Sequence, residues 1–185
     1  MKKIHQANLD EKQLKTKQVF AGHLLKLWVD QVELPNGHTS SREYIKHQGA
    51  VGILPILEDG RIVFVKQCRY AVDSVIYEIP AGKLEIGEDH LLCAQRELSE
   101  ETGYSADSWQ RLTTIVTTPG FTNEAIDLYV AKDLTLGEQH PDEDEFLEVV
   151  AFTPQEVRQM VINQEIFDAK TLSALLLYFY AEDKK

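Results

Sequence analysis

The sequence predicts an α/β (α+β) fold in which helices pack on a mixed β-sheet. Segments with the apolar patterns of strands outnumber the helical segments. The turn clusters Pro35-Asn36-Gly37 and Glu58-Asp59-Gly60 separate neighbouring strands as in hairpins. A chain of 185 residues, 43% of them apolar, is long enough to bury a core of this kind.

The first half of the chain contains mostly strands. Residues 23–34 and 40–47 flank the first turn cluster, and we assign this hairpin to a small N-terminal antiparallel β subdomain, residues 1–46. The rest, residues 47–185, forms the larger domain. Its first strands are expected at 49–57, 61–69 and 74–80.

Capping signals place the helices in the second half. Asp89 can cap a helix that runs to about Thr102, and Gly103 suits the position just past its end. Thr153-Pro154-Gln155-Glu156 reads as a capping box for a helix to about Asn163, and Asp168 caps a last helix through Tyr180. The remaining strands are expected at 111–118, 125–131 and 146–152.

Charge and composition exclude several classes of protein. A net charge of −11 argues against nucleic-acid binding, which needs Lys and Arg to replace counterions. Cys68 and Cys93 do not form a CxxC pair, so we expect free thiols in a reducing compartment. Residues 1–18 contain no apolar stretch of a signal peptide, and no segment is long enough to span a membrane. A cytoplasmic protein is expected.

Three glutamates, Glu97, Glu100 and Glu101, fall on one ridge of the helix that Asp89 caps. Like charges at this spacing destabilise a helix, and the last two also face the negative end of the helix dipole. Two interpretations follow. The ridge is either a solvated acidic face or a site for a divalent cation, whose binding would offset the repulsion.

The flanks of this ridge favour the cation site. Gly82 is followed after five residues by Glu88, and after seven more by Arg96-Glu97-Leu98-Ser99-Glu100-Glu101-Thr102-Gly103-Tyr104. This segment resembles the Nudix box, G-x5-E-x7-R-E-U-x-E-E-x-G-U with U apolar, and every defined position is filled. The last U is Tyr104, a variant. The resemblance implies a Nudix α/β/α sandwich and a hydrolase of nucleoside diphosphates linked to another group.

The resemblance also implies roles for the residues of the box. Glu97 and Glu101 would be the principal ligands of Mg²⁺, or of Mn²⁺ as a substitute, and Glu100 would assist. The carbonyl of Ala81 would complete the set. Arg96 would orient the glutamates, with Glu88 in a supporting position.

Outside the box the chain is similar to the ADP-ribose pyrophosphatase subgroup. Pro119 lies sixteen residues after Gly103, and EIPAGKLE (78–85), VKQCR (65–69) and DEDEFLEV (142–149) resemble segments of that subgroup. The resemblance implies hydrolysis of ADP-ribose to AMP and ribose 5-phosphate. It further implies a homodimer in which the N-terminal hairpins exchange and both subunits contact the substrate.

Substrate contacts are carried over from the same resemblance. Trp28 would stack on adenine, although it also suits an apolar contact between subunits. Arg42 and Arg69 would contact phosphate or ribose oxygens, for which a guanidinium is suited; Arg42 on an edge strand could equally be solvated. The remaining expected contacts are Leu84, Gly120 and Phe121.

A general base must take a proton from the attacking water, and the acidic loop offers four carboxylates. Glu145 aligns best with the subgroup and Glu143 is the next candidate. Asp142 and Asp144 lie in the same loop.

Two alternatives remain open for the function. The first is a Nudix pyrophosphatase for another nucleoside diphosphate sugar, such as a GDP- or UDP-hexose. The second is a Nudix domain that senses ADP-ribose without cleaving it, which the complete box disfavours.

Overall fold

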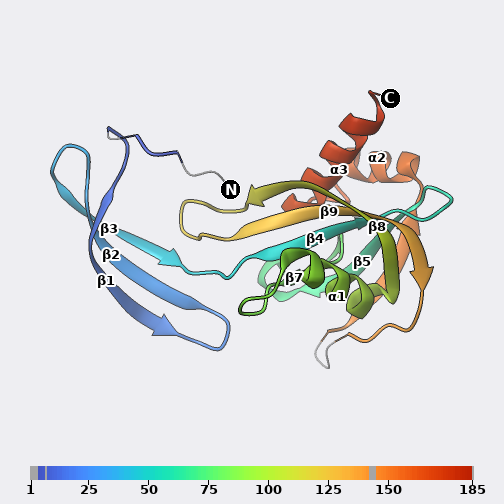
Figure 1. The fold of residues 1–185 in the computed structure, drawn as a ribbon, viewed down its shortest axis with the longest axis horizontal. Helices are drawn as coiled ribbons and strands as arrows, with labels where there is room; N and C mark the ends of the chain where they lie inside the picture. The colour runs from blue at the N-terminus through green and yellow to red at the C-terminus, as the bar shows by residue number, and fades with distance from the viewer. Residues whose placement is uncertain (1–3, 7, 142–144, 185) are drawn as a thin grey trace. The chain divides into compact units, whose positions relative to one another are not determined.

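The computed structural model describes residues 4–6, 8–141 and 145–184, and the chain divides into two compact units (Figure 1). The first unit contains Met1–Gln48 and the loop Val116–Ala125. The second contains Gly49–Ile115 and Ile126–Lys185. Each unit is described by itself.

The first unit is a three-stranded antiparallel sheet in the order β1-β2-β3. Its strands are β1 (Lys12–Ala21), β2 (Lys26–Glu33) and β3 (Thr39–Ile45). The expected hairpin corresponds to β2 and β3, and β1 is an addition. All residues of β1 are exposed, so its sequence shows no alternation of buried and exposed residues that would mark a strand. Two irregularities also interrupt its pairing register with β2.

The loop Val116–Ala125 is bonded to the last residue of β3 and to the chain that follows it. The N–H of Ile45 donates to the carbonyl of Phe121 at 2.9 Å. The N–H of His47 donates to Oδ1 of Asn123 at 2.7 Å, and Nδ2 of Asn123 donates back to the His47 carbonyl at 3.0 Å. These bonds explain why a loop from the middle of the sequence belongs to the N-terminal unit.

The second unit contains two sheets. One has the order β7-β4-β9-β8, in which β4 is parallel to β9 and antiparallel to β7. The other has the order β10-β5-β6 and is antiparallel. The strands are β4 (Ala50–Pro55), β5 (Ile62–Arg69), β6 (Ser74–Glu78), β7 (Ala81–Lys83), β8 (Tyr104–Val116), β9 (Ala125–Leu136) and β10 (Leu147–Phe152).

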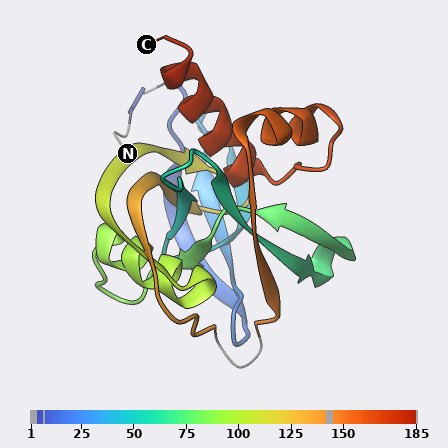
Figure 2. The same ribbon diagram turned by 90° about the vertical axis from the view of Figure 1, so that its right-hand side faces the viewer.

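Strand β4 is buried on both faces, as expected for a strand covered by helices on two sides. Leu54 contributes to a core cluster with residues of α2 (Pro154–Ile162) and α3 (Ala169–Glu182). Ile53, on the opposite face, packs in a second cluster with residues of α1 (His90–Thr102). Figures 1 and 2 show α1 on one side of the sheet and the other two helices on the other. The expected α/β/α sandwich is confirmed.

The helices begin and end close to the predicted residues. Asp89 accepts from the N–H groups of Leu91 and Leu92, and Gly103 ends α1 at φ 74°. Thr153 and Glu156 form the expected capping box of α2, and Asp168 caps α3. No helix within the described residues is long and apolar enough to cross a membrane.

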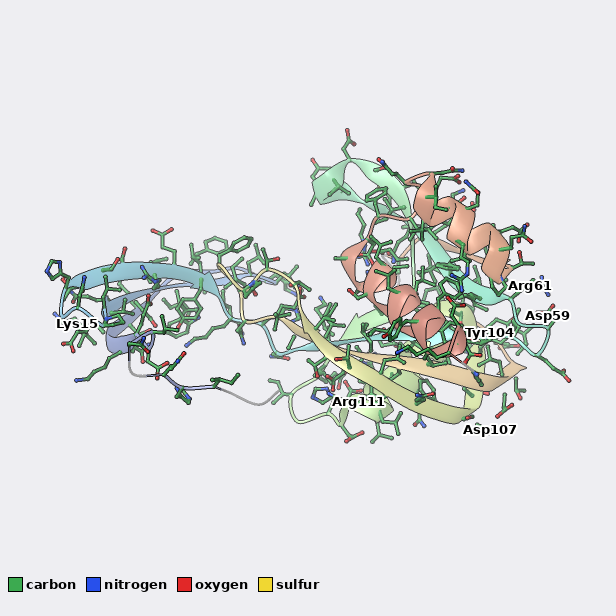
Figure 3. The ribbon with its side chains drawn as sticks, turned by 90° about the horizontal axis from the view of Figure 1, so that it is seen from above. Lys15, Asp59, Arg61, Tyr104, Asp107 and Arg111 are labelled. Carbon is green, nitrogen blue, oxygen red and sulfur yellow. The ribbon has the colours of Figure 1, made fainter. Side chains whose placement is uncertain are left out.

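In the second unit, three strands differ clearly from the prediction. Strand β8 starts at Tyr104 rather than 111, and Figure 3 shows Tyr104, Asp107 and Arg111 along it. Its first half is largely exposed, so it lacks the apolar run that marks a buried strand. Strand β9 continues to Leu136, and β7 is a further short strand just before α1.

Candidate active site

The site is built where β7 meets α1. A Cβ atom on Gly82 would overlap the carboxylate of Glu97, so only glycine leaves room for that side chain against the backbone of β7. The box glycine and the first glutamate of the ridge are therefore in contact, although the sequence separates them by a loop and two helical turns.

Arg96 links three carboxylates. Its Nε and Nη2 donate to the two oxygens of Glu88 at 3.0 and 3.1 Å. Its Nη1 donates to Glu97 and to Glu100, both at 2.8 Å. Hydrogen bonds from Arg96 and then from the Glu85 N–H lower the pKa of Glu88 to about 2. The pKa of Arg96 is raised by the same bonds, so this guanidinium stays charged.

Glu101 is the most buried member of the ridge, with 3% of its surface exposed. Its Oε2 accepts the N–H of Ala81 at 3.0 Å. Burial raises the pKa of Glu101 to about 8; the bond from Ala81 opposes the rise, and the charges of Glu97 and Glu145 add to it. Burial also raises the pKa of Glu97, against the effect of Arg96. Burial therefore disfavours the charged forms of both carboxylates.

The donor set fits a hard divalent cation. Glu97, Glu100, Glu101 and the carbonyl of Ala81 supply only oxygen, the ligand that Mg²⁺ and Mn²⁺ prefer. Because Gly82 has no side chain, the carboxylate of Glu97 can lie against the backbone of β7. Within the described residues, no three side chains of His, Cys, Asp or Glu converge at metal-holding distances. The oxygens of Glu97, Glu100 and Glu101 instead accept hydrogen bonds from Arg96 and from the Ala81 N–H.

Glu145 lies at the start of the segment leading into β10 and lines a groove of about 440 Å³. Its charge acts on both Glu97 and Glu101, so it lies within electrostatic range of the ridge. Phe146 beside it is 84% exposed. The other candidate bases, Asp142, Glu143 and Asp144, lie outside the described residues.

Arg69 ends β5, and its Nε donates to Oε2 of Glu78 at 2.8 Å. Its Nη2 forms an ion pair with the same oxygen at 2.7 Å. Its charge favours the ionised form of Glu101. Leu84, by contrast, is only 7% exposed and packs in the core cluster under α1. Its side chain therefore has little surface left for a ligand.

Four expected contacts lie in the first unit. The ring of Trp28 on β2 has the ammonium of Lys46 3.6 Å from its centroid, and its buried Nε1 has no hydrogen-bond partner among the described residues. Arg42 on β3 forms an ion pair with Glu11. Gly120 and Phe121 lie in the loop Val116–Ala125, where the Phe121 side chain is exposed.

Sequence reasoning missed two buried charged clusters in the second unit. Glu78 bonds Arg69 and Lys170, and Asp127 bonds Arg111, Thr114 and His90. A charged residue at an inward position of an apolar strand, as in SVIYEIP and AIDLYVA, is the signal that could have found both carboxylates.

Comparisons with known proteins agree with this geometry. The NUDIX domain model matches residues 46–175. The chain belongs to the Nudix family. The model of the nucleoside diphosphate sugar hydrolase N-terminal domain matches residues 11–45.

Two relatives are similar over most of their length. The methanol dehydrogenase activator of Bacillus methanolicus is 47% identical, covering 90% of this chain and 91% of the relative. The ADP-ribose pyrophosphatase of Bacillus subtilis strain 168 is 44% identical, covering 91% of this chain and 92% of the relative. A solved structure described as an ADP compounds hydrolase superimposes with a TM-score of 0.87 over 97% of this chain and 98% of that one, at 22% identity, and supports the fold.

The chain is therefore a Nudix hydrolase with a complete box. Nudix hydrolases generally depend on a divalent metal ion, which matches the oxygen donors of the ridge.

Proposed function

We propose that this Nudix hydrolase cleaves ADP-ribose to AMP and ribose 5-phosphate. The observation that carries the proposal is the 44% identity, over 91% of the chain, to a relative named ADP-ribose pyrophosphatase, together with an intact ridge of Glu97, Glu100 and Glu101. In this reaction the oxygen of water bonds to one phosphorus of the pyrophosphate, and the bridging P–O bond breaks.

We propose Mg²⁺, with Mn²⁺ as a substitute, as the metal. Glu97, Glu101, Glu100 and the Ala81 carbonyl would hold it. When bound, the ion neutralises charge on the pyrophosphate and makes a water molecule more nucleophilic. Arg96 would keep the glutamates in place through the bonds described above.

Glu145 is the proposed general base. Its support is electrostatic proximity to Glu97 and Glu101, and its place in a groove large enough to admit part of a ligand. Glu143 is the alternative, and a carboxylate from either position would receive the proton lost by the attacking water.

Substrate contacts are proposed from both units. Arg69 would bind phosphate or ribose oxygens, and Trp28 would stack on adenine, with Arg42, Gly120 and Phe121 completing the site. We propose a backbone contact for Leu84 because its side chain is buried. The N-terminal unit would serve dimerisation and substrate binding.

A homodimer is supported by the first unit, which exposes apolar residues and buries the Trp28 Nε1 without a partner among the described residues. We propose that the enzyme acts in the cytoplasm, where its two free thiols, Cys68 and Cys93, would stay reduced. The net charge of −11 disfavours nucleic acid as a partner.

Product analysis tests the substrate. The protein is incubated with Mg²⁺ and, separately, ADP-ribose, UDP-glucose, GDP-mannose and NADH. AMP and ribose 5-phosphate, formed much faster from ADP-ribose than products from the others, are expected. Faster turnover of a hexose nucleotide would keep the mechanism and reject the substrate. Binding of ADP-ribose without turnover would indicate a sensor.

A further inference from the structure

Three residues form a row across the sheet on which α1 lies (Figure 1). Val51 of β4 pairs with Gly82 of β7 on one side and with Asp127 of β9 on the other. Residues paired in this way point to the same face of a sheet, and here that face is covered by α1. Gly82 and Asp127 are two strand spacings apart, which is about 10 Å.

Helix α1 contacts both ends of this row. His90 is its first residue, and Nδ1 of His90 lies 2.8 Å from Oδ2 of Asp127 as an ion pair. Glu97 follows seven residues later, and its carboxylate lies where a Cβ of Gly82 would be. Seven helical residues rise about 10.5 Å and return to nearly the same side of the helix. The spacing of the two contacts on α1 therefore matches their spacing on the sheet.

Asp127 is a fixed point for the first turn of α1. It is only 8% exposed, and its other partners belong to β8. Arg111, labelled in Figure 3, donates from Nη2 to Oδ1 at 2.9 Å and from Nε to Oδ2 at 3.3 Å. The hydroxyl of Thr114 also donates to Oδ1. Because these bonds come from the sheet, the carboxylate keeps its place whether or not His90 contacts it.

The other contacts of α1 act in a different way. Asp89 caps the helix through N–H groups of the helix itself, so this bond does not tie α1 to the sheet. Apolar contacts with the sheet are not directional. At the far end of α1, Nε2 of Gln139 donates to the carbonyl of Glu101 at 2.7 Å. Without the contact at Asp127, α1 would be free to turn about that end, and Glu97, near the middle of the helix, would move with it.

We propose that His90 is a positioning residue for the acidic ridge: by contacting Asp127, it fixes the direction of α1 across the sheet and thereby sets the Glu97 carboxylate over Gly82. The inference rests on the proposed function, because Glu97 is assigned there as a ligand of Mg²⁺ or Mn²⁺. It places a determinant of metal affinity at an undefined position of the Nudix box.

A purely stabilising ion pair makes a different prediction. In either case, loss of His90 lowers the free energy of unfolding, and so does loss of Arg111, the other charged partner of Asp127. Only the positioning role predicts that the metal affinity of the folded protein depends on His90 and not on Arg111, because His90 alone of the two belongs to α1.

The test measures the dissociation constant for Mn²⁺ without substrate, from the electron paramagnetic resonance signal of free Mn²⁺, well below the thermal midpoint of each variant. We expect the constant of His90→Ala to be about 5- to 20-fold above that of wild type. His90→Asn, which keeps a donor facing Asp127, should return it to within about threefold. Arg111→Met is the matched control, and its constant should stay within about twofold of wild type because its hydrogen bonds go to β8 and β9.

An unchanged constant in folded His90→Ala would overturn the proposal, and so would an equal rise in Arg111→Met. If His90→Ala does not fold, His90→Glu takes its place, because a carboxylate suits the first turn of a helix but repels Asp127. The constant should rise there as well, and an unchanged value decides equally against the proposal.

Binding of Mn²⁺ by wild type separates this inference from the proposed function. If wild type and His90→Ala bind Mn²⁺ equally, only the positioning role fails. If wild type binds no Mn²⁺, the metal assignment and this inference fail together. The identity of the nucleotide sugar does not affect the result, because no substrate is present.

Discussion

Arg96 is the residue on which the acidic ridge depends. It bonds Glu88, Glu97 and Glu100, and thereby brings together carboxylates that would otherwise repel one another. Glu88 accepts two hydrogen bonds, from Nε and Nη2 of Arg96. This two-point contact fixes the orientation of the guanidinium plane. The ridge is held in place before any metal binds.

The bond between Glu88 and Arg96 predicts a pH-dependent stability. Because folding lowers the pKa of Glu88 to about 2, the stabilisation is complete above its usual pKa near 4.5 and is lost as the pH falls toward 2. Glu88→Gln should cost about 1–2 kcal/mol of unfolding free energy at pH 7. Urea denaturation should show a smaller difference at pH 3.5. Glu58→Gln, in an exposed turn, is the control, and a pH-independent difference would contradict the assignment.

Gly82→Ala should damage activity more than stability. The added Cβ would overlap the Glu97 carboxylate and displace it, and a displacement of about 1 Å can lower kcat/KM about 100-fold. Gly60→Ala is the control in which stability changes and activity does not. Gly60 has φ 84°, which strains a residue with a Cβ, but an added Cβ would meet no neighbouring atom. That variant should lose about 1 kcal/mol of stability and keep its activity. Equal activity in both variants would disprove the steric argument.

The residues of the ridge followed from the sequence because motif spacing and helical geometry fix them locally. Glu97, Glu100 and Arg96 lie within one helical segment, so their proximity needs no tertiary information. The pair of Glu78 and Lys170 could not be predicted in this way. The two residues come from different elements, and only the packing of α3 against β6 brings their charges together.

At the scale of elements, the two C-terminal helices are capped in different ways. Thr153 caps α2 through a local box with Glu156. Asp168 caps α3 and also bonds Lys170, whose other partner is buried Glu78. The first cap depends on its own helix alone, and the second is part of the unit's core.

Removing each cap should therefore have a different cost. Thr153→Ala is expected to lower the unfolding free energy by about 1 kcal/mol. Asp168→Ala should cost about 3 kcal/mol or more, because it also breaks a buried ion network. Chemical denaturation of both variants measures the difference. Equal losses would show that Asp168 acts only as a helix cap.

Elements with strong local signals were predicted well, and the exposed strands were not. The caps Asp89, Thr153 and Asp168 identified the three α-helices of the described residues. Strand β1 and the first half of β8 were missed because their residues are mostly exposed and carry no apolar alternation. Such strands form through backbone pairing with a neighbour, which the sequence of the strand itself does not reveal.

At the scale of the whole molecule, metal dependence is the most direct test of the ridge. EDTA should abolish hydrolysis, and Mg²⁺ or Mn²⁺ should restore it. Glu101→Gln should lower kcat about 100-fold or more at saturating metal, with Glu58→Gln again unaffected. Full activity in EDTA would exclude the proposed role of the glutamates.

The proposed homodimer predicts a solution mass twice that of the 21.1-kDa chain. Light scattering after size exclusion measures it. Phe20→Glu should weaken the dimer, since Phe20 is one of the apolar residues that the first unit exposes. Lys15→Glu, on the same strand, controls for the added charge. A monomeric wild type at micromolar concentration would contradict the proposal.

The loop Val116–Ala125 constrains how such chains can recombine. The chain leaves the second unit after Ile115, supplies partners to Ile45 and His47, and returns at Ile126. An exchange of residues 1–48 between relatives would join the new strands to a foreign loop and break those bonds. Functional chimeras should therefore inherit both segments from one parent, so that two distant stretches of the gene evolve as a single inherited module.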